Sequence, residues 1–175
     1  VSAAMFISTD ISETKRTEAR QSYLSTHDVL TGLYNRAYFE SELLRLQAEG
    51  PFPISIIMAD VDGMKQANDY HGHAAGDDLL RRVAKVLHQA FRQQDLVARI
   101  GGDEFVIFLP GASNLAARSA VGRLRNLIQK ANQQPGSPPL SLSIGVHTAQ
   151  DGDSLLSALQ QADACMYAEK NQRKS

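Results

Sequence analysis

Residues 96–109 read LVARIGGDEFVIFL, and this stretch decides the fold class. Two runs rich in β-branched and aromatic residues, 96–100 and 105–109, flank the four residues Gly101-Gly102-Asp103-Glu104. Two such runs joined by a short turn that contains glycine predict a β-hairpin. A hairpin within the sheet excludes an all-parallel, doubly wound architecture.

The segments on either side of the hairpin alternate between helix and strand. Residues 54–59 form a nearly continuous apolar run, which is typical of a strand buried on both faces. Strict alternation over 140–146 predicts another strand with one solvent-facing side. Apolar residues at helical spacing predict helices that begin near Asn35, span 79–91 and 114–131, and follow Asp153. The order helix, strand, helix, hairpin, helix, strand, helix favours an α/β (α+β) sandwich of ferredoxin-like type, with a mainly antiparallel central sheet flanked by helices.

The size and composition of the chain limit the classes of function that it can have. The chain has 175 residues, enough for one domain and a short appendage. Its 18 Lys and Arg against 19 Asp and Glu give a net charge of −1, so no bulk positive charge exists to drive nucleic-acid binding. No apolar run approaches the roughly 18 residues that span a bilayer. The single cysteine, Cys165, excludes an internal disulfide framework and favours a reducing, cytoplasmic setting.

The first 25 residues are expected to stand apart from a compact domain at residues 26–175. Asp10 to Glu13 has the pattern of a capping box, and a mostly polar helix is expected to follow it over 12–24. A helix with so narrow an apolar face is typical of a segment that connects domains or pairs with another helix. The alternative is a frayed N-terminal arm. The first residues show no signal-peptide pattern, and we interpret the chain as a piece of a longer protein.

Carboxylates follow the predicted strand ends. Asp60 and Asp62 come directly after the most buried strand, and Asp103 and Glu104 lie at the tip of the hairpin. If Asp60 and Asp103 meet at one end of the sheet, they must be protonated or share a cation. Oxygen ligands without spare cysteines point to Mg²⁺ or Mn²⁺, whose coordination is usually completed by substrate phosphates. Taken alone, the Asp60-Val61-Asp62 motif has a pair of surface Asp residues as its alternative. The alternative for Gly101-Gly102-Asp103-Glu104 alone is an ordinary turn.

The segment between the acidic motifs offers groups for a phosphate and a base. Lys65 is predicted on the turn after the strand, where its ammonium can reach a phosphate. Asn68 and Asp77 can read guanine, because an Asp carboxylate accepts from the N1–H and N2–H groups. The alternatives are a solvated lysine, a turn-forming Asn and a helix-capping Asp. His71 and His73 lack a third soft ligand, so a structural pair is favoured over a zinc site.

Together these motifs resemble the GGDEF family of diguanylate cyclases. Residues 99–105, RIGGDEF, are similar to the family signature, and 27–36, HDVLTGLYNR, to the segment that opens the domain. Residues 60–77 resemble the family's metal and guanine segment, and 143–145 and 162–170 its last strand and helix. The resemblance covers about residues 25–174, and the ordered set of motifs is highly specific. It implies a nucleotide-cyclase-like version of the sandwich.

The resemblance implies the condensation of two GTP molecules to cyclic di-3′,5′-GMP with release of two pyrophosphates. Each domain would hold one GTP, so a homodimer would be needed for catalysis. Mg²⁺ or Mn²⁺ would be bound by Asp60, Asp103 and the Val61 carbonyl, with Glu104 beside the reacting groups. Guanine would be read by Asn68 and Asp77. The phosphates would be held by Lys65, Lys170, backbone N–H groups near Gly63 and Met64, and Lys174 or Arg173.

Two further features accompany the resemblance. Arg92-Gln-Gln-Asp95 is similar to the family's RxxD product-inhibition site, to which Arg123 would add a second arginine; a helix-end salt bridge is the alternative. Residues 5–16 resemble the end of a PAS sensor domain that runs into a signalling helix. The alternative to an active cyclase is a catalytically weak regulatory module that binds GTP or cyclic di-GMP.

Overall fold

The computed structural model describes residues 15–17, 20–133 and 138–174, without the side chain of Lys174. A helical stretch at residues 20–26 precedes the named elements. These are α2 (Arg36–Glu49), β1 (Ile54–Val61), α3 (Met64–His71), α4 (His73–Ala90), β2 (Leu96–Arg99), β3 (Glu104–Pro110), α5 (Asn114–Ala131), β4 (Leu142–Ala149) and α6 (Leu155–Lys174).

The four strands form one sheet in the order β2-β3-β1-β4, and each neighbouring pair is antiparallel. The predicted hairpin is β2–β3, in which Arg99 lies opposite Phe105. The predicted fold class, an α+β sandwich with an antiparallel sheet, is therefore confirmed. The structure contains one element that the sequence analysis did not predict, the short helix α3, so Lys65 lies in a helix and not on a turn.

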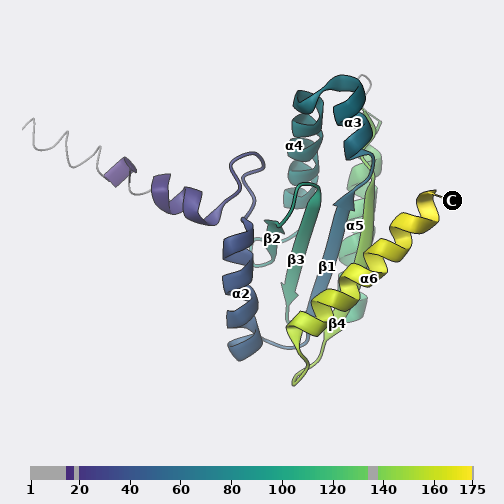
Figure 1. Ribbon diagram of the computed structural model, residues 1–175. Coiled ribbons are helices and arrows are strands. Elements are labelled where there is room, and N and C mark those ends of the chain that lie inside the picture. The colour runs from purple at the N-terminus through teal and green to yellow at the C-terminus, as the bar shows by residue number, and fades with distance from the viewer. Residues whose placement is uncertain (1–14, 18–19, 134–137, 175) are drawn as a thin grey trace, which may run out of the picture.

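The sheet separates two apolar cores. Helices α4 and α5 cover one face, and α6 crosses the other, with α2 on the same side (Figure 1). Side chains of β1 alternate between the cores: Ile57 and Ala59 face α4 and α5, whereas Ile56 and Met58 face α2 and α6. Because all eight residues of β1 are buried, this strand holds its end, Asp60-Val61, firmly in place.

The solvent-facing side predicted for the strand at 140–146 is wrong. Ser143 and Gly145 of β4 are buried, because α6 packs directly on that face. A Cβ atom on Gly145 would overlap the carbonyl oxygen of Ala162 in α6. The small residues of the alternation therefore mark a close helix–strand approach instead of a wet surface.

The segment before α2 attaches to the edge strand β2. The Tyr34 amide donates to the Val97 carbonyl at 3.2 Å, and the Arg99 amide donates to the Tyr34 carbonyl at 2.9 Å. Residues 20–26 lie to one side of the sheet (Figure 1). The expected capping box at 10–13 and most of the PAS-like segment 5–16 fall outside the described residues. In the described part of the chain, no helix is long and apolar enough to cross a membrane.

Candidate active site

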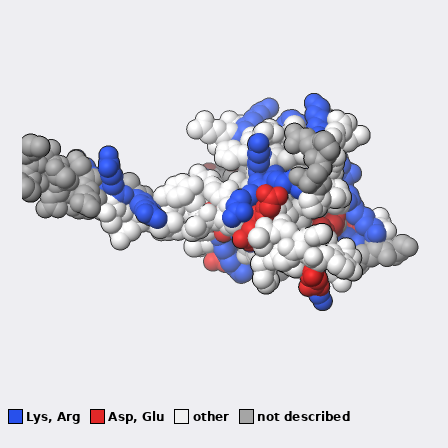
Figure 2. Space-filling model, turned by 90° about the horizontal axis from the view of Figure 1, so that it is seen from above, with Lys and Arg blue, Asp and Glu red and all other residues white. Residues whose placement is uncertain are grey.

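The predicted carboxylates meet at the end of β1. Asp60 lies opposite Glu104 of β3 on one side and Ser143 of β4 on the other. The Val61 amide donates to the Asp103 carbonyl at 2.9 Å, which places the hairpin tip beside the strand end. Viewed onto this end of the sheet, acidic side chains gather in one place, with lysine and arginine side chains beside them (Figure 2). The structure thus brings Asp60, Asp103 and Glu104 together.

Asp60 is the most buried of these carboxylates, with 5% of its surface exposed. Lys170 of α6 donates from Nζ to Asp60 Oδ1 at 2.6 Å. Burial raises the pKa of Asp60, and repulsion from Asp103 and Asp62 raises it further, against the opposing effect of Lys170. Burial alone would lower the pKa of Lys170, but the hydrogen bond and the attraction to Asp60 outweigh it and raise that pKa. This end of the sheet therefore carries more negative charge than Lys170 alone neutralises.

Glu104 lies beside the Asp60–Lys170 ion pair, and the pKa of its carboxyl is raised above the ordinary value. Burial is the main cause, followed by repulsion from Asp103, Asp60 and Asp163. The Glu104 side chain folds over Gly101, where an added Cβ would collide with the carboxylate. A side chain at the first glycine of the signature would therefore displace the Glu104 carboxylate from this position.

Asp62 has a role that the sequence analysis did not assign. Its carboxylate accepts from Ser141 Oγ at 2.6 Å, from Ser143 Oγ at 2.7 Å and from Arg173 at 3.2 Å. These bonds tie the end of β1 to β4 and to the last turn of α6. Arg173, which also bonds Ser141 and Glu169, is therefore positioned at the site, whereas the Lys174 side chain lies outside the described residues. No local sequence pattern marks these pairings, because they join segments that are far apart in the chain.

Helix α3 begins directly after the strand end. Gly63 adopts a positive φ of 78° and turns the chain into the helix, whose first residues are Met64 and Lys65. The first amide groups of a helix have no carbonyl partner within it and favour a bound anion. These groups border a hollow that is also lined by Asp103, Lys170 and Arg173. The hollow therefore combines helix amides with cationic side chains.

A second hollow adjoins the first and shares Met64, Lys65 and Asp103 with it. Asn68 and Asp77 line this second hollow, from α3 and α4. The Asn68 amide packs against Gly76, where an added Cβ would collide with it. Neither Lys65 nor Asp77 has a hydrogen bond or ion pair to another side chain in the described part of the chain. Lys65, Asn68 and Asp77 thus line one continuous surface, on which Lys65 and Asp77 are free to bind a ligand.

The donor set suits a hard divalent cation. Among the described residues, no group of three or more His, Cys, Asp or Glu side chains is arranged to hold a metal ion, and this includes His71 and His73. Two carboxylates and a backbone carbonyl are nevertheless sufficient for Mg²⁺, which usually completes its shell with water and substrate phosphates. The uncompensated negative charge around Asp60 fits such an ion.

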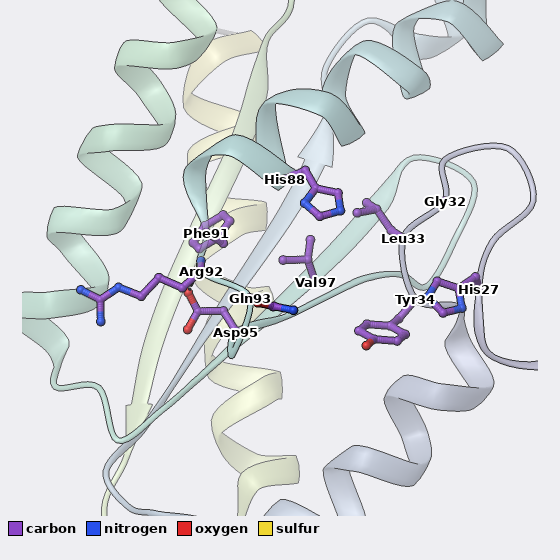
Figure 3. A pocket seen from close by; sticks show the side chains of 10 residues that line it. All are labelled: His27, Gly32, Leu33, Tyr34, His88, Phe91, Arg92, Gln93, Asp95 and Val97. Carbon is purple, nitrogen blue, oxygen red and sulfur yellow. Dashed lines mark hydrogen bonds between the residues drawn. The ribbon is translucent and has the colours of Figure 1, made fainter. Parts of the chain in front are cut away.

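The RxxD residues lie at the other end of β2 from the signature. The Asp95 carboxylate accepts from the Arg92 amide at 2.7 Å, so Asp95 caps the turn after α4. The alternative predicted for this motif, a helix-end salt bridge, does not form within the described residues. Arg123 donates from Nε to the Ala90 carbonyl at 2.7 Å, which brings both arginines to the end of α4. The Arg92 guanidinium is exposed and points away from the neighbouring side chains (Figure 3).

Comparison with known proteins defines the class. The family model described as diguanylate cyclase, GGDEF domain, matches residues 25–175, and the chain therefore belongs to this family. Over 93% of its length it is 35% identical to diguanylate cyclase VdcA of Vibrio cholerae and 33% identical to diguanylate cyclase DgcM of Escherichia coli. It covers 49% and 40% of those proteins, so it spans half or less of the curated relatives that it matches.

A solved structure agrees over nearly the whole chain. The coiled coil and GGDEF domain of DgcB from Caulobacter crescentus, in complex with c-di-GMP, superposes with a TM-score of 0.83 and 28% sequence identity. The match covers 97% of this chain and 94% of that one. The family inferred from the ordered motifs is thus confirmed.

Proposed function

We propose that this chain is an active diguanylate cyclase, which condenses two GTP molecules into cyclic di-3′,5′-GMP and two pyrophosphates. The observation that carries the proposal is the meeting of Asp60, Asp103 and Glu104 at one sheet end, beside the start of α3 and Lys170. Relatives named as diguanylate cyclases support the reaction.

Asp60, Asp103 and the Val61 carbonyl would hold Mg²⁺ or Mn²⁺. Such an ion, when bound, polarises the α-phosphate and favours the 3′-oxyanion. Glu104 would lie next to the attacking hydroxyl, and its raised pKa suits a group that takes up a proton. Lys170 would neutralise phosphate charge once a cation has taken its place at Asp60.

The two adjoining hollows would bind different parts of the GTP molecule. The amides near Gly63 and Met64, with Lys65, Lys170 and either Lys174 or Arg173, would hold the triphosphate. Asn68 and Asp77 would read guanine, since a carboxylate accepts from both of its donors. A half-buried Asp77 without a partner in the described part of the chain supports this assignment.

Catalysis would require two copies of the chain, because each domain holds one of the two nucleotides. Their hollows would face each other across an antiparallel homodimer. Product would bind at Arg92, Asp95 and Arg123, away from the GTP hollows, and restrain the domains. The c-di-GMP complex of the similar DgcB structure supports cyclic di-GMP as a partner of this fold.

The segment before the cyclase domain would carry a signal into it. We place the cyclase domain at 26–175 and interpret residues 1–25 as the end of an upstream PAS-like sensor domain and a linker helix. The helical stretch at 20–26, joined to the edge strand through Tyr34, supports a connecting role.

Turnover of GTP tests the proposal. The purified chain is incubated at high concentration with GTP and Mg²⁺ or Mn²⁺, and products are separated by chromatography. The wild type should form cyclic di-GMP, Asp103→Asn should form none, and the exposed-loop control Asp151→Asn should match the wild type. Binding of GTP or cyclic di-GMP without any product would instead identify a regulatory module.

A further inference from the structure

A third hollow opens on the other side of Glu104, between α2 and α6, which stand on the same side of the sheet (Figure 1). Its apolar lining consists of Phe39, Met58, Ile100 and Leu159. Glu104 and Asp163 add two carboxylates, and Arg36 is the one cation among the described residues that line it. This hollow shares no lining residue with the two that border Asp103.

The backbone fixes the position of Arg36 at this hollow. Arg36 is the first residue of α2, and Asn35 caps that helix by accepting from the Tyr38 amide at 2.9 Å. Tyr34, just before the cap, is hydrogen-bonded through its backbone to β2. The helix therefore begins beside the hairpin whose second strand starts with Glu104.

The Arg36 guanidinium is available to a ligand. Its ion pair in the described part of the chain is with Glu40, at 2.8 Å and one helical turn away. Both side chains are exposed, and such a pair contributes little to stability. Glu40 and, to a smaller degree, Glu104 raise the pKa of Arg36. The guanidinium can thus exchange Glu40 for a phosphate, whose oxygens accept paired hydrogen bonds from arginine.

The proposed reaction brings a second phosphate to this side of Glu104. Lys65, Lys170 and Arg173 line the hollow beyond Asp103, so the triphosphate held by one copy has cations of its own. The 3′-hydroxyl beside Glu104 must meet the α-phosphate of the nucleotide that the second copy holds. A cation beside a transferring phosphoryl group stabilises the transition state.

We propose that Arg36 is a catalytic residue that acts across the dimer, by donating to the α-phosphate oxygens of the nucleotide bound to the second copy. Glu104 takes the proton from the 3′-hydroxyl of the nucleotide in its own copy. The electron pair on O3′ forms a bond to the α-phosphorus of the other nucleotide. The bond from that phosphorus to the bridging oxygen breaks, and its electrons leave with pyrophosphate. The inference rests on the cyclase activity proposed above and adds the cation that meets the attacked phosphate.

Arg36→Gln tests the role of the cation. At saturating GTP and Mg²⁺, its initial rate of cyclic di-GMP formation should be at least about a hundredfold below that of the wild type. Its affinity for GTP, measured by equilibrium dialysis of dilute protein, should be unchanged. Arg45→Gln breaks an ion pair with Glu42 on the same helix and is the matched control, with the wild-type rate expected. Glu40→Gln removes the partner but leaves the cation, and it should also keep the rate.

A mixture of two inactive variants tests whether Arg36 acts across the dimer. Asp103→Asn removes a proposed metal ligand, so the nucleotide in that copy should not be attacked. In a mixed dimer, the nucleotide on the Arg36→Gln copy keeps its metal site and meets the intact Arg36 of the other copy. One bond should therefore form, and the linear dinucleotide pppGpG should accumulate well above its level with either variant alone.

The possible failures are distinguishable. Equal rates for Arg36→Gln and the wild type, or a loss of rate explained by weaker GTP binding, would overturn the catalytic role. A mixture without linear product would assign Arg36 to the nucleotide of its own copy and overturn the action across the dimer. A wild type that forms no cyclic di-GMP would overturn the proposed function, and this inference with it.

Discussion

Lys170 Nζ lies 2.6 Å from Asp60 Oδ1, so the last helix of the chain neutralises the most buried carboxylate of the sheet end. The two residues are 110 positions apart in the sequence. Repulsion from Asp103 and Asp62 acts on the same carboxylate. The pair therefore stabilises the acidic end of the sheet before any substrate arrives, and it holds Lys170 where a triphosphate is proposed to bind.

Lys170→Met tests this pairing by removing the ammonium while keeping the aliphatic stem. Asp60 would be left buried without its partner, at an expected cost of about 1–3 kcal/mol in the free energy of unfolding. Mg²⁺ should recover part of that loss, because the cation would take the position of the ammonium. Denaturant unfolding with and without Mg²⁺ measures both effects, with Lys130→Met, on an exposed site, as the control. Equal stability of Lys170→Met and wild type would contradict the role of the pair.

Glu104→Gln tests whether burial and the neighbouring carboxylates destabilise the ionised form of Glu104. The folded protein holds a proton on Glu104 more tightly than the unfolded chain does, because the pKa is raised above its ordinary 4.5. The stability that the protonated form contributes is therefore lost as pH rises through the folded pKa. The variant should melt at a higher temperature than the wild type at neutral pH, and this gain should vanish below the ordinary pKa.

Melting curves over a pH series measure that difference. The same variant should lose turnover, since Glu104 is proposed to act beside the attacking hydroxyl. A lower melting temperature of Glu104→Gln at neutral pH would show that the carboxylate is stabilised, not strained, by its surroundings.

Gly76→Ala tests the guanine hollow. The added methyl would collide with the Asn68 amide, which is the end of a side chain and can move aside. Folding should be little affected, but displacement of Asn68 should weaken GTP binding about tenfold. Gly122→Ala is the matched control, because open space surrounds Gly122 in α5. Titration with GTP separates them; unchanged GTP affinity in Gly76→Ala would remove Asn68 from the guanine site.

Much of this fold could be predicted because its elements have strong periodicity. The hairpin, the buried strand that became β1 and the helix at 114–131 all appear with ends close to those expected. Helix α3 could not be predicted, since none of its eight residues is fully buried and only Met64 and Ala67 pack partly against the core. Ser154 and not Asp153 caps α6, as Ser154 Oγ accepts from the Ser157 amide, whereas Asp153 accepts from Gln150.

The residues of the candidate site could be predicted from the sequence, but the hydrogen bonds between them could not. Asp60 lies near the end of β1 and Asp103 lies in the turn before β3, and both of these strands are visible in the sequence. The bonds from Asp62 to Ser141, Ser143 and Arg173 join segments 79 to 111 positions apart, and no local pattern records such pairings.

Dilution tests the requirement for two domains. Residues 20–26 expose only two large apolar side chains, Tyr23 and Leu24, so the isolated chain should dimerise weakly. Specific activity should rise with protein concentration at saturating GTP, because only dimers bring two nucleotides together. Initial rates across a dilution series, with light scattering on the same samples, provide the measurement. A constant specific activity in samples that are monomeric throughout would contradict the two-domain reaction.

The stoichiometry of the reaction tests the central claim most directly. Cyclic di-GMP and pyrophosphate are quantified in the same samples of concentrated protein with GTP and Mg²⁺, for wild type and Asp60→Asn. The wild type should release two pyrophosphates for each cyclic di-GMP, and folded Asp60→Asn should release neither. Pyrophosphate without the cyclic product, or equal yields from both proteins, would contradict a cyclase centred on Asp60 at the end of β1.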